Sequence, residues 1–471
     1  MSGVDAIPTG CFVGGTFVDG GQGFEVLDKF HLTPAARVSA ADAATISRAL
    51  DLAAAYQPAS GAERAALLHR VRDRVAERRD AFRDAMVVEA GFPMRDAAGE
   101  IARALETLKL SAEEAGRLTG EMVPFDGAPG GAGRIGFTLR KPVGIVVAIT
   151  PFNAPLNTVC HKIGPAVAAG NAVILKPSDR TPLTANLLAE CFAEAGAPDG
   201  VLAVLHGGAD VAGLLLDDPR PGFYAFTGST QAGRAIQARA GLRRTQMELG
   251  SIAGTIVLAD ADIGEAAAKC AGASFRKAGQ VCTSIQLLLV EKRALPEFGD
   301  AYLSHVETLV AGDPAREETD VGPVISPEAA DRIAALLEGQ TLLTGGERDR
   351  SVIEPTVIAD PDPLSAAATR EIFGPVVCLI GVDSLDEAIA RVNATPYGLA
   401  TGLFTRDLGA AFRAADQLHV GGVHVGETSS SRVDLMPYGG VKASGFGHEG
   451  PARAVREMSE ERLVTFTGFA S

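Results

Sequence analysis

The chain has 471 residues, of which 46% are hydrophobic and 21% are charged, so it is long enough to bury large cores and is expected to form about three domains. Its 58 acidic and 43 basic residues give a net charge of −15, which argues against nucleic acid as a partner. The sequence has no basic and apolar leader and no apolar run near the ~18 residues of a membrane span, so we expect a soluble cytoplasmic protein that binds no membrane. It also has neither a CxxC pair nor a grouping of cysteines with histidines, so we expect no disulfide framework and no metal site.

Residues 40–120 have the apolar spacing of amphipathic helices. In EIARALETLKLSAEEAGRL, for example, one stripe is formed by Ile101, Leu105, Leu108 and Ala112. The glycine-rich stretch GAPGGAGRIGF (127–137) cannot hold a helix, and it predicts a hairpin or a bridging loop.

Short apolar runs alternate with helical patterns from residue 143 onward. Fully apolar strands that alternate with helices indicate a parallel sheet covered on both faces, so the expected class is α/β. A second alternation predicts a second α/β domain after about residue 248, with the ligand crevice between the two domains. The first set of runs is 143–149, 172–176, 201–205 and 223–226, and the second is 255–258, 376–382 and 401–405.

Two candidate binding motifs follow the first two of these strands. In PFN (151–153), Asn153 could donate an amide N–H to a developing oxyanion, although a turn asparagine is the alternative. In ILKPSDRTPLTA (174–185), Lys176 and Asp179 could reach a phosphate and ribose hydroxyls. The alternative for this pair is a lysine lying along the surface and an N-cap aspartate.

A candidate phosphate site follows the fourth strand, in FTGSTQAGRAI (226–236). There Gly228 and Gly233 flank Ser229 and Thr230, so backbone N–H groups are exposed at the start of a helix, where the helix dipole favours a phosphate. A purely structural glycine turn remains the alternative, and the motif is not a GxGxxG fingerprint.

Glu248 and Cys282 are the candidates for proton transfer and nucleophilic attack. Glu248 lies between apolar residues in MELGS, where its pKa would be raised as a general base requires, unless it points to water from an edge strand. Cys282, in GQVCTS (279–284), is the cysteine set among small and polar residues, whereas the alternative is an inert core thiol. We assign the other five cysteines to packing, namely Cys11, Cys160, Cys191, Cys270 and Cys378.

These motifs, in this order, resemble those of the aldehyde dehydrogenase superfamily along nearly the whole chain. The matching segments are TPFN, LKPSDRTPLTA, FTGST, ELG, GQVCTS, EIFGPV (371–376) and MPYGGVKASGFG (436–447). The resemblance implies a Rossmann-like cofactor domain, an α/β catalytic domain and a small bridging β arm. It places the cofactor domain in residues 1–119 and 142–247, the catalytic domain in 248–454, and the arm, which would build a homodimer or homotetramer, in 120–141 and 455–471.

The resemblance also implies a role for each candidate in the NAD(P)-dependent oxidation of an aldehyde. Cys282 would be the nucleophile, Asn153 the oxyanion donor, and Glu248 the base that activates water against a thioester. Lys176 would support the cofactor ribose and catalysis, and the presence of Glu248 argues against the branch that acylates coenzyme A. The residues implied to contact the cofactor are Ile149, Thr150, Pro151, Phe152, Lys176, Ser178, Asp179, Phe226, Thr227, Gly228, Ser229, Gly233, Leu249, Gly250, Glu371 and Phe373.

Three residues depart from the usual family pattern. Ser251 and Ile252 follow ELG, and Lys277 stands in FRKAGQ where asparagine is common. We expect them to alter packing or cofactor binding rather than the bond-making chemistry. Asp179 lies where an acidic residue favours NAD, although Arg180 beside it leaves NADP possible.

The substrate expected from the sequence is a short aldehyde that carries a carboxylate, phosphonate, phosphate or sulfonate. Arg103 lies near the position of a substrate-binding arginine in relatives that oxidise such aldehydes, although Val281 stands where some of them have another arginine. Arg432 and Thr283 are further candidates for substrate contact. The alternatives are a solvated Arg103 on the face opposite the apolar stripe and a general aliphatic, lactaldehyde-like or semialdehyde dehydrogenase without anion preference. A non-catalytic paralogue is the least favoured interpretation.

Overall fold

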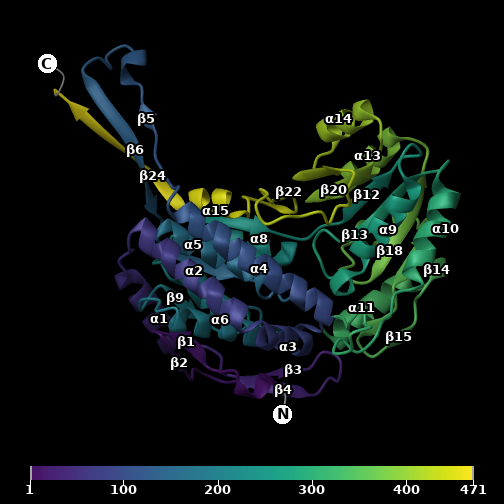
Figure 1. Ribbon diagram of the computed structural model, residues 1–471, viewed down its shortest axis with the longest axis horizontal. Helices are drawn as coiled ribbons and strands as arrows, with labels where there is room; N and C mark the ends of the chain where they lie inside the picture. Colours follow the sequence, from purple (N-terminus) through teal and green to yellow (C-terminus); the bar gives the residue numbers. More distant parts are fainter. Residues whose placement is uncertain (1–2, 469–471) are drawn as a thin grey trace.

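The computed structural model describes residues 3–468, in which helices pack on two large sheets and a small sheet projects from the body of the molecule (Figure 1). The α/β class expected from the sequence is confirmed. Within the described residues, none of the helices combines the length and the apolar character that crossing a bilayer requires.

The first sheet contains the strands predicted from residue 143 onward. Its eight strands have the order β2-β1-β9-β8-β7-β10-β11-β23. The central five run parallel, and they are β7 (Ile145–Ile149), β8 (Ala172–Lys176), β9 (Leu202–Val204), β10 (Phe223–Thr227) and β11 (Arg244–Glu248). The antiparallel edge strands are β1 (Cys11–Val13) and β2 (Thr16–Val18) on one side and β23 (Gly445–Phe446) on the other.

Helices cover both faces of this sheet, which explains why its strands are apolar at every position. In β7, Val146 and Ala148 face one core, whereas Ile145 and Val147 face the other. The first core is covered by α2 (Gly61–Glu77), α3 (Arg79–Ala90), α4 (Met94–Ala115), α5 (Asn157–Ala169) and α6 (Pro182–Glu194). The second is covered by α1 (Ala43–Ala55), α7 (Ala209–Asp217) and α8 (Thr230–Ala240).

The second sheet contains the three strands of the second predicted alternation and four further strands. Its order is β14-β17-β18-β13-β12-β20-β21, and all of these strands run parallel except the edge strand β14. The strands are β12 (Ala253–Val257), β13 (Ile285–Glu291), β14 (Leu342–Thr344), β17 (Thr356–Ala359), β18 (Val376–Val382), β20 (Ala400–Phe404) and β21 (Gly422–Val425). The helices of this region are α9 (Ile263–Ser274), α10 (Leu295–Val306), α11 (Pro327–Leu337), α12 (Ala366–Thr369), α13 (Leu385–Ala394) and α14 (Leu408–Gln417).

A three-stranded antiparallel sheet projects from the body of the molecule (Figure 1). It is formed by β5 (Met122–Val123), β6 (Arg134–Pro142) and β24 (Ser459–Thr467), with β6 in the centre. The first part of the glycine-rich stretch, 127–133, therefore connects β5 to β6 and its last four residues begin β6, so the stretch belongs to a hairpin, one of the two forms that the sequence predicts. We call these three strands the arm.

Residues 445–457 lie on the first sheet rather than on the second, which differs from the uninterrupted catalytic domain expected to residue 454. Strand β23 pairs with β11, and α15 (Pro451–Glu457) packs on α4 and α5. A buried ion pair between Lys162 of α5 and Glu449 provides the physical reason, because it holds this segment against the first sheet. The carboxyl end of β11 is thereby covered by residues from the end of the chain.

The remaining short elements connect these layers. They are η1 (Gly3–Ala6), β3 (Phe24–Leu27), β4 (Pro34–Val38), η2 (Phe125–Gly127), η3 (Arg276–Gly279), β15 (Arg348–Asp349), β16 (Val352–Ile353), β19 (Tyr397–Gly398) and β22 (Val441–Lys442).

Candidate active site

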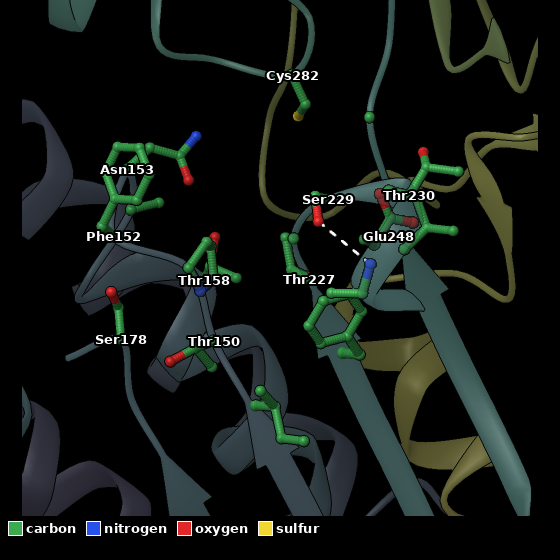
Figure 2. Close-up of a pocket in the computed structure, with 18 of the residues that line it drawn as sticks. Thr150, Phe152, Asn153, Thr158, Ser178, Thr227, Ser229, Thr230, Glu248 and Cys282 are labelled. Carbon is green, nitrogen blue, oxygen red and sulfur yellow. Dashed lines mark hydrogen bonds between the residues drawn. The ribbon is translucent and has the colours of Figure 1, made fainter. Parts of the chain in front are cut away.

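A cavity of about 1100 Å³ lies beyond the carboxyl ends of the parallel strands of the first sheet. It is lined by the residues that follow β7, β8, β10 and β11, by η3 and by the loop before β22. Figure 2 shows Cys282 pointing into a space with Asn153 on one side and Glu248 on the other. The three residues that the sequence singles out for chemistry therefore meet in one cavity.

Cys282 is held in this position by a tightly turned loop. Lys277 and Ala278 have positive φ angles of 52° and 54°, and Gly279 has φ 68° with no room for a Cβ, which would lie 2.0 Å from the carbonyl oxygen of Gly374. Positive φ is costly for residues other than glycine, so the surrounding contacts must maintain this conformation. The loop leaves Cys282 partly accessible, whereas the other five cysteines are buried, as the sequence predicts.

The Cys282 thiol contacts the hydroxyl of Tyr438, with 2.8 Å between Sγ and Oη. Burial raises the pKa of the thiol to about 11, and the hydrogen bond with Tyr438 opposes that rise. The thiol is therefore protonated near neutral pH, and attack on a carbonyl carbon requires a base to remove its proton.

Asn153 is buried beside the nucleophile, and its amide is fixed in orientation. Its Nδ2 donates to the carbonyl oxygen of Gln280 over 2.7 Å, which leaves the second N–H of the amide for an oxyanion. Lys277 supports this arrangement from the other side, because its Nζ donates to the Asn153 carbonyl oxygen at 3.0 Å and pairs with Glu100 of α4 at 2.7 Å. Lys277, which departs from the usual family pattern, thus holds the backbone of Asn153 by a hydrogen bond, and its own position is fixed by the buried ion pair with Glu100.

Glu248, the last residue of β11, is 2% exposed and does not point to water. Neither carboxylate oxygen has a hydrogen-bond partner among the described residues. Burial and the nearby charge of Glu449 raise the pKa of Glu248 well above its usual range, against the opposing effects of Lys162 and Arg432. A carboxylate of this kind can accept a proton near neutral pH, as a general base must.

Glu449 lies at the centre of a buried charge cluster next to Glu248. Its carboxylate accepts from Lys162 at 3.1 Å, from Arg432 at 2.9 Å and from the Thr227 hydroxyl at 3.3 Å. Burial opposes its ionisation, but Lys162 and Arg432 hold the pKa of Glu449 well below its usual range. Glu449 therefore remains charged, and its charge keeps the neighbouring Glu248 basic.

Both arginines proposed from the sequence for substrate binding line the cavity, but each is paired with a carboxylate. Arg103 binds Asp434 through Nη2 and Nε at 2.7 and 3.3 Å, so it is not the solvated residue of the alternative interpretation. Arg432 pairs with Glu449, and its guanidinium lies 3.7 Å from the centre of the Tyr438 ring. Thr283 also lines the cavity, and its carbonyl oxygen accepts the hydroxyl of Ser430.

The opposite end of the cavity contains most of the residues that the resemblance implies for the cofactor. The Ser229 hydroxyl accepts from the N–H of Ala232 at the start of α8, where the helix dipole favours a phosphate. A Cβ at Gly250 would lie 2.7 Å from Oε2 of Glu371, so backbone and carboxylate approach closely here. Of the sixteen cofactor residues implied by the resemblance, fifteen line the cavity, and the exception is Gly233. Gly233 instead permits close packing, because a Cβ there would lie 2.4 Å from Leu249.

Lys176, Ser251 and Ile252 each contact other residues near the cofactor end of the cavity. Burial lowers the pKa of Lys176, whose Nζ donates to the carbonyl oxygens of Pro177 and Gly207 at 2.9 and 2.7 Å. The backbone N–H of Ser251 donates to Glu371 at 2.8 Å, and Ile252 is buried in the core of the second sheet. Neither departure obstructs the cavity.

Four residues of this site are absent from the sequence-based proposals. Tyr438 lies in the quoted segment MPYGGVKASGFG (436–447), and Glu449 lies two residues after the end of that segment. Lys162 is the one charged residue in the apolar helix α5, which is a signal of buried pairing. Arg276 lies next to Lys277 on η3 and also lines the cavity.

Comparisons with known proteins agree with this arrangement. A model of the aldehyde dehydrogenase family matches residues 17–464. The chain is 42% identical to 3-sulfolactaldehyde dehydrogenase of Priestia megaterium over 463 aligned residues, and the alignment covers 97% of each chain. Its structure is similar to aldehyde dehydrogenase 21 of Physcomitrella patens in complex with the product succinate, with a TM-score of 0.93, 34% identity and 98% coverage of each chain. It is also similar to NADP-dependent glyceraldehyde-3-phosphate dehydrogenase of Bacillus halodurans complexed with NADP. The TM-score is 0.94 and the identity 30%, and the match covers 98% of this chain and 99% of the other.

The charge of Glu449 can be tested through the ionisation of Glu248. In Glu449→Gln, a repelling charge is removed and Lys162 and Arg432 are left to face Glu248, so we expect the pKa of Glu248 to fall by about one unit or more. Infrared titration of the protonated carboxyl band, after subtraction of the Glu248→Gln spectrum, measures this change. Glu457→Gln is the matched control, because Glu457 also repels Glu248 but less strongly. An unchanged pKa in Glu449→Gln would show that the cluster does not control Glu248.

Proposed function

The chain belongs to the aldehyde dehydrogenase family, and from this premise we propose that it oxidises a short, negatively charged aldehyde to the carboxylic acid by covalent catalysis at Cys282. The observation that carries the proposal is that Cys282, Asn153 and Glu248 line one cavity together with fifteen of the residues implied to contact NAD(P). The nucleophile and the oxyanion donor lie on different loops, where Tyr438 contacts the thiol and the Gln280 carbonyl oxygen orients the amide, and the base is the buried last residue of β11.

In the first half of the reaction, Cys282 adds to the aldehyde carbon. Glu248 or water takes the proton of the thiol, a C–S bond forms, and the carbonyl oxygen becomes an oxyanion. The free N–H of the Asn153 amide and the backbone N–H of Cys282 are the donors for this oxyanion. When bound, NAD(P) supplies the acceptor for the hydride that the aldehyde carbon loses, and Cys282 is left as a thioester.

In the second half, Glu248 removes a proton from water. Any proton that Glu248 took from the thiol must first pass to solvent. The hydroxide adds to the thioester carbon, the C–S bond breaks, the carboxylic acid leaves, and Glu248 returns the proton of the water to the Cys282 thiolate. The raised pKa of Glu248 suits this step, because a carboxylate of ordinary pKa would be a weak base. The charge of Glu449 beside it disfavours a second negative charge, so Glu248 accepts a proton readily.

The residues at the cofactor end support a preference for NAD over NADP. Asp179 follows β8 and lines the cavity near Ser178 and Lys176. A carboxylate there repels a 2′-phosphate, whereas the exposed Arg180 next to it weakens this discrimination. The Bacillus halodurans structure contains NADP, so both cofactors belong in the test.

The polar lining of the catalytic end supports a small, charged aldehyde rather than an aliphatic one. Tyr438 contacts the Cys282 thiol, Arg432 lies over the Tyr438 ring, and Thr158, Ser430 and Arg103 line the same cavity. The names of the relatives point to the same class, because sulfolactaldehyde, glyceraldehyde 3-phosphate and the product succinate all carry an anionic group. A neutral lactaldehyde or semialdehyde without anion recognition is the alternative.

The division of the chain into functional parts is also a proposal. We assign cofactor binding to residues 1–119 and 142–247 and catalysis to 248–454, with Glu449 reaching back to the first sheet. The arm, formed by β5, β6 and β24, is proposed to bind a second copy of the chain; of the range 455–471 expected for it from the sequence, residues 455–457 belong to α15, which packs on the body. One of its faces carries Ile135, Phe137 and Leu139 of β6, opposite Phe466, Val464 and Arg462 of β24. Ile135 and Leu139 are 51% and 37% exposed, which is unusual for apolar residues on one face.

Kinetics on a panel of aldehydes, with NAD and NADP in parallel, test the proposed reaction. We expect the highest kcat/KM for short aldehydes with an anionic group, and a preference for NAD. Cys282→Ala is the blank and should lose at least about 1000-fold in activity, because no thioester can form. The reaction class is wrong if no aldehyde reduces the cofactor, and the substrate class is wrong if neutral aldehydes of equal length react as well as anionic ones.

Charges on the exposed face of the arm test the proposed assembly. In a variant with Ile135→Glu and Leu139→Glu, like charges would be buried against the second copy, so we expect the oligomer to dissociate into monomers. Light scattering after size-exclusion chromatography measures the mass. Leu242→Glu is the control, because Leu242 is fully exposed and lies outside the arm. A double variant that keeps the mass of the wild type would contradict the proposal.

A further inference from the structure

Lys277 is only 8% exposed, and it lies on the turn that precedes Cys282. Its Nζ pairs with Glu100 of α4 at 2.7 Å and lies 4.5 Å from the centre of the Phe92 ring. It also donates to the backbone carbonyl oxygen of Asn153 at 3.0 Å. Burial opposes the ionisation of Glu100, but the charge of Lys277 holds the pKa of Glu100 below its usual value, so the pair is ionised.

Three hydrogen bonds join Lys277, Gln280 and Asn153 in a closed ring. Lys277 donates to the Asn153 carbonyl oxygen, and the backbone N–H of Gln280 donates to the Lys277 carbonyl oxygen at 3.1 Å. The Asn153 amide donates to the Gln280 carbonyl oxygen at 2.7 Å and closes the ring. Of the three bonds, only the one from Lys277 comes from a charged group, and charged donors form the stronger hydrogen bonds. The ring fixes both the backbone and the side chain of the oxyanion donor relative to the nucleophile turn.

The backbone of Lys277 is strained and is held by buried carboxylates. Its φ of 52° lies in the left-handed region, which is costly for a residue with a Cβ. Asp96 accepts its backbone N–H at 2.8 Å, and Glu100 holds its side chain. The second carboxylate oxygen of Glu100 accepts the backbone N–H of Asn157, the first residue of α5, at 2.8 Å. The nucleophile turn is therefore held by α4 and by the start of the helix that follows the oxyanion donor in the chain.

We propose that Lys277 is a positioning residue for oxyanion formation: its ammonium keeps the Asn153 amide aimed at the aldehyde oxygen when Cys282 attacks the carbonyl carbon. The benefit of an oxyanion donor depends on its being oriented before the reaction begins. In this role Lys277 acts through Asn153 rather than on the substrate itself. The inference rests on the proposed function, because it concerns the addition of Cys282 to an aldehyde.

Two reactions of Cys282 separate positioning from general disruption of the loop. Addition to an aldehyde converts the carbonyl oxygen into an oxyanion, which the Asn153 amide stabilises. Alkylation by iodoacetamide forms a C–S bond while the C–I bond breaks, and iodide leaves with the electron pair, so no oxyanion is formed. A defect confined to the orientation of Asn153 therefore slows the first reaction and leaves the second unchanged.

The first test variant is Lys277→Met, which keeps an unbranched side chain and removes the donor. We expect the rate of the first turnover, measured by stopped-flow reduction of NAD with the panel aldehyde of highest kcat/KM, to fall about 10- to 100-fold. The KM for the aldehyde should change little, because the lost interaction is made in the transition state. The rate of Cys282 alkylation should equal that of the wild type. Lys277→Arg, which keeps a charged donor, should recover part of the first-turnover rate.

A second variant guards against loss of the fold, because Lys277→Met leaves Glu100 buried without its cation. Lys277→Met combined with Glu100→Gln removes both charges and keeps an acceptor for the N–H of Asn157, and it should show the same loss of first-turnover rate. Lys29→Met is the matched control, because Lys29 is also buried but does not line the cavity. This control should keep the wild-type rates of first turnover and alkylation. Far-ultraviolet circular dichroism and NAD binding confirm that each variant is folded.

The outcomes separate this inference from the proposed function. If the wild type reduces neither NAD nor NADP with any aldehyde of the panel, the proposed function fails and this inference fails with it. If the wild type reacts and both Lys277→Met variants keep its first-turnover rate, only the role of Lys277 is overturned. If first turnover and alkylation slow together in the folded variants, Lys277 supports the whole loop rather than the oxyanion donor, which also overturns the proposal.

Discussion

The ion cluster around Glu449 is the interaction on which the rest of the site depends. It joins Lys162 of α5 to Arg432 of the loop before β22, and these residues come from regions that are 270 or more positions apart in the chain. A buried carboxylate of this kind is stable only while both cations remain in place. The cluster therefore holds the end of the chain over the first sheet and, through its charge, keeps Glu248 basic. Glu449 therefore both holds the end of the chain in place and raises the pKa of Glu248.

The catalytic end concentrates charged side chains in a protein of net charge −15. Its buried charges are matched locally: Arg103 with Asp434, Lys277 with Glu100, and Lys162 and Arg432 with Glu449.

Local patterns in the sequence predict much of this fold and site, because parallel strands, glycine turns and the settings of Cys282, Glu248 and Asn153 are local properties. Strand β13 was not predicted, since it follows the nucleophile loop without an intervening helix. The contact between Cys282 and Tyr438 joins residues 156 positions apart, and the partner of Arg103 lies 331 positions away. Pairing over such distances depends on the packed fold and has no local signal. Arg103, a substrate candidate in the sequence, is paired with Asp434 in the structure and still lines the cavity.

The central claim is that the substrate is held as a thioester on Cys282 until Glu248 activates water. Mass spectrometry of Glu248→Gln, mixed with cofactor and an anionic aldehyde and then digested, tests this claim most directly. We expect the acyl group of the substrate to accumulate on the peptide that contains Cys282, because attack remains possible and hydrolysis does not. An unmodified Cys282 after cofactor reduction, or an acyl group on another cysteine, would contradict the account.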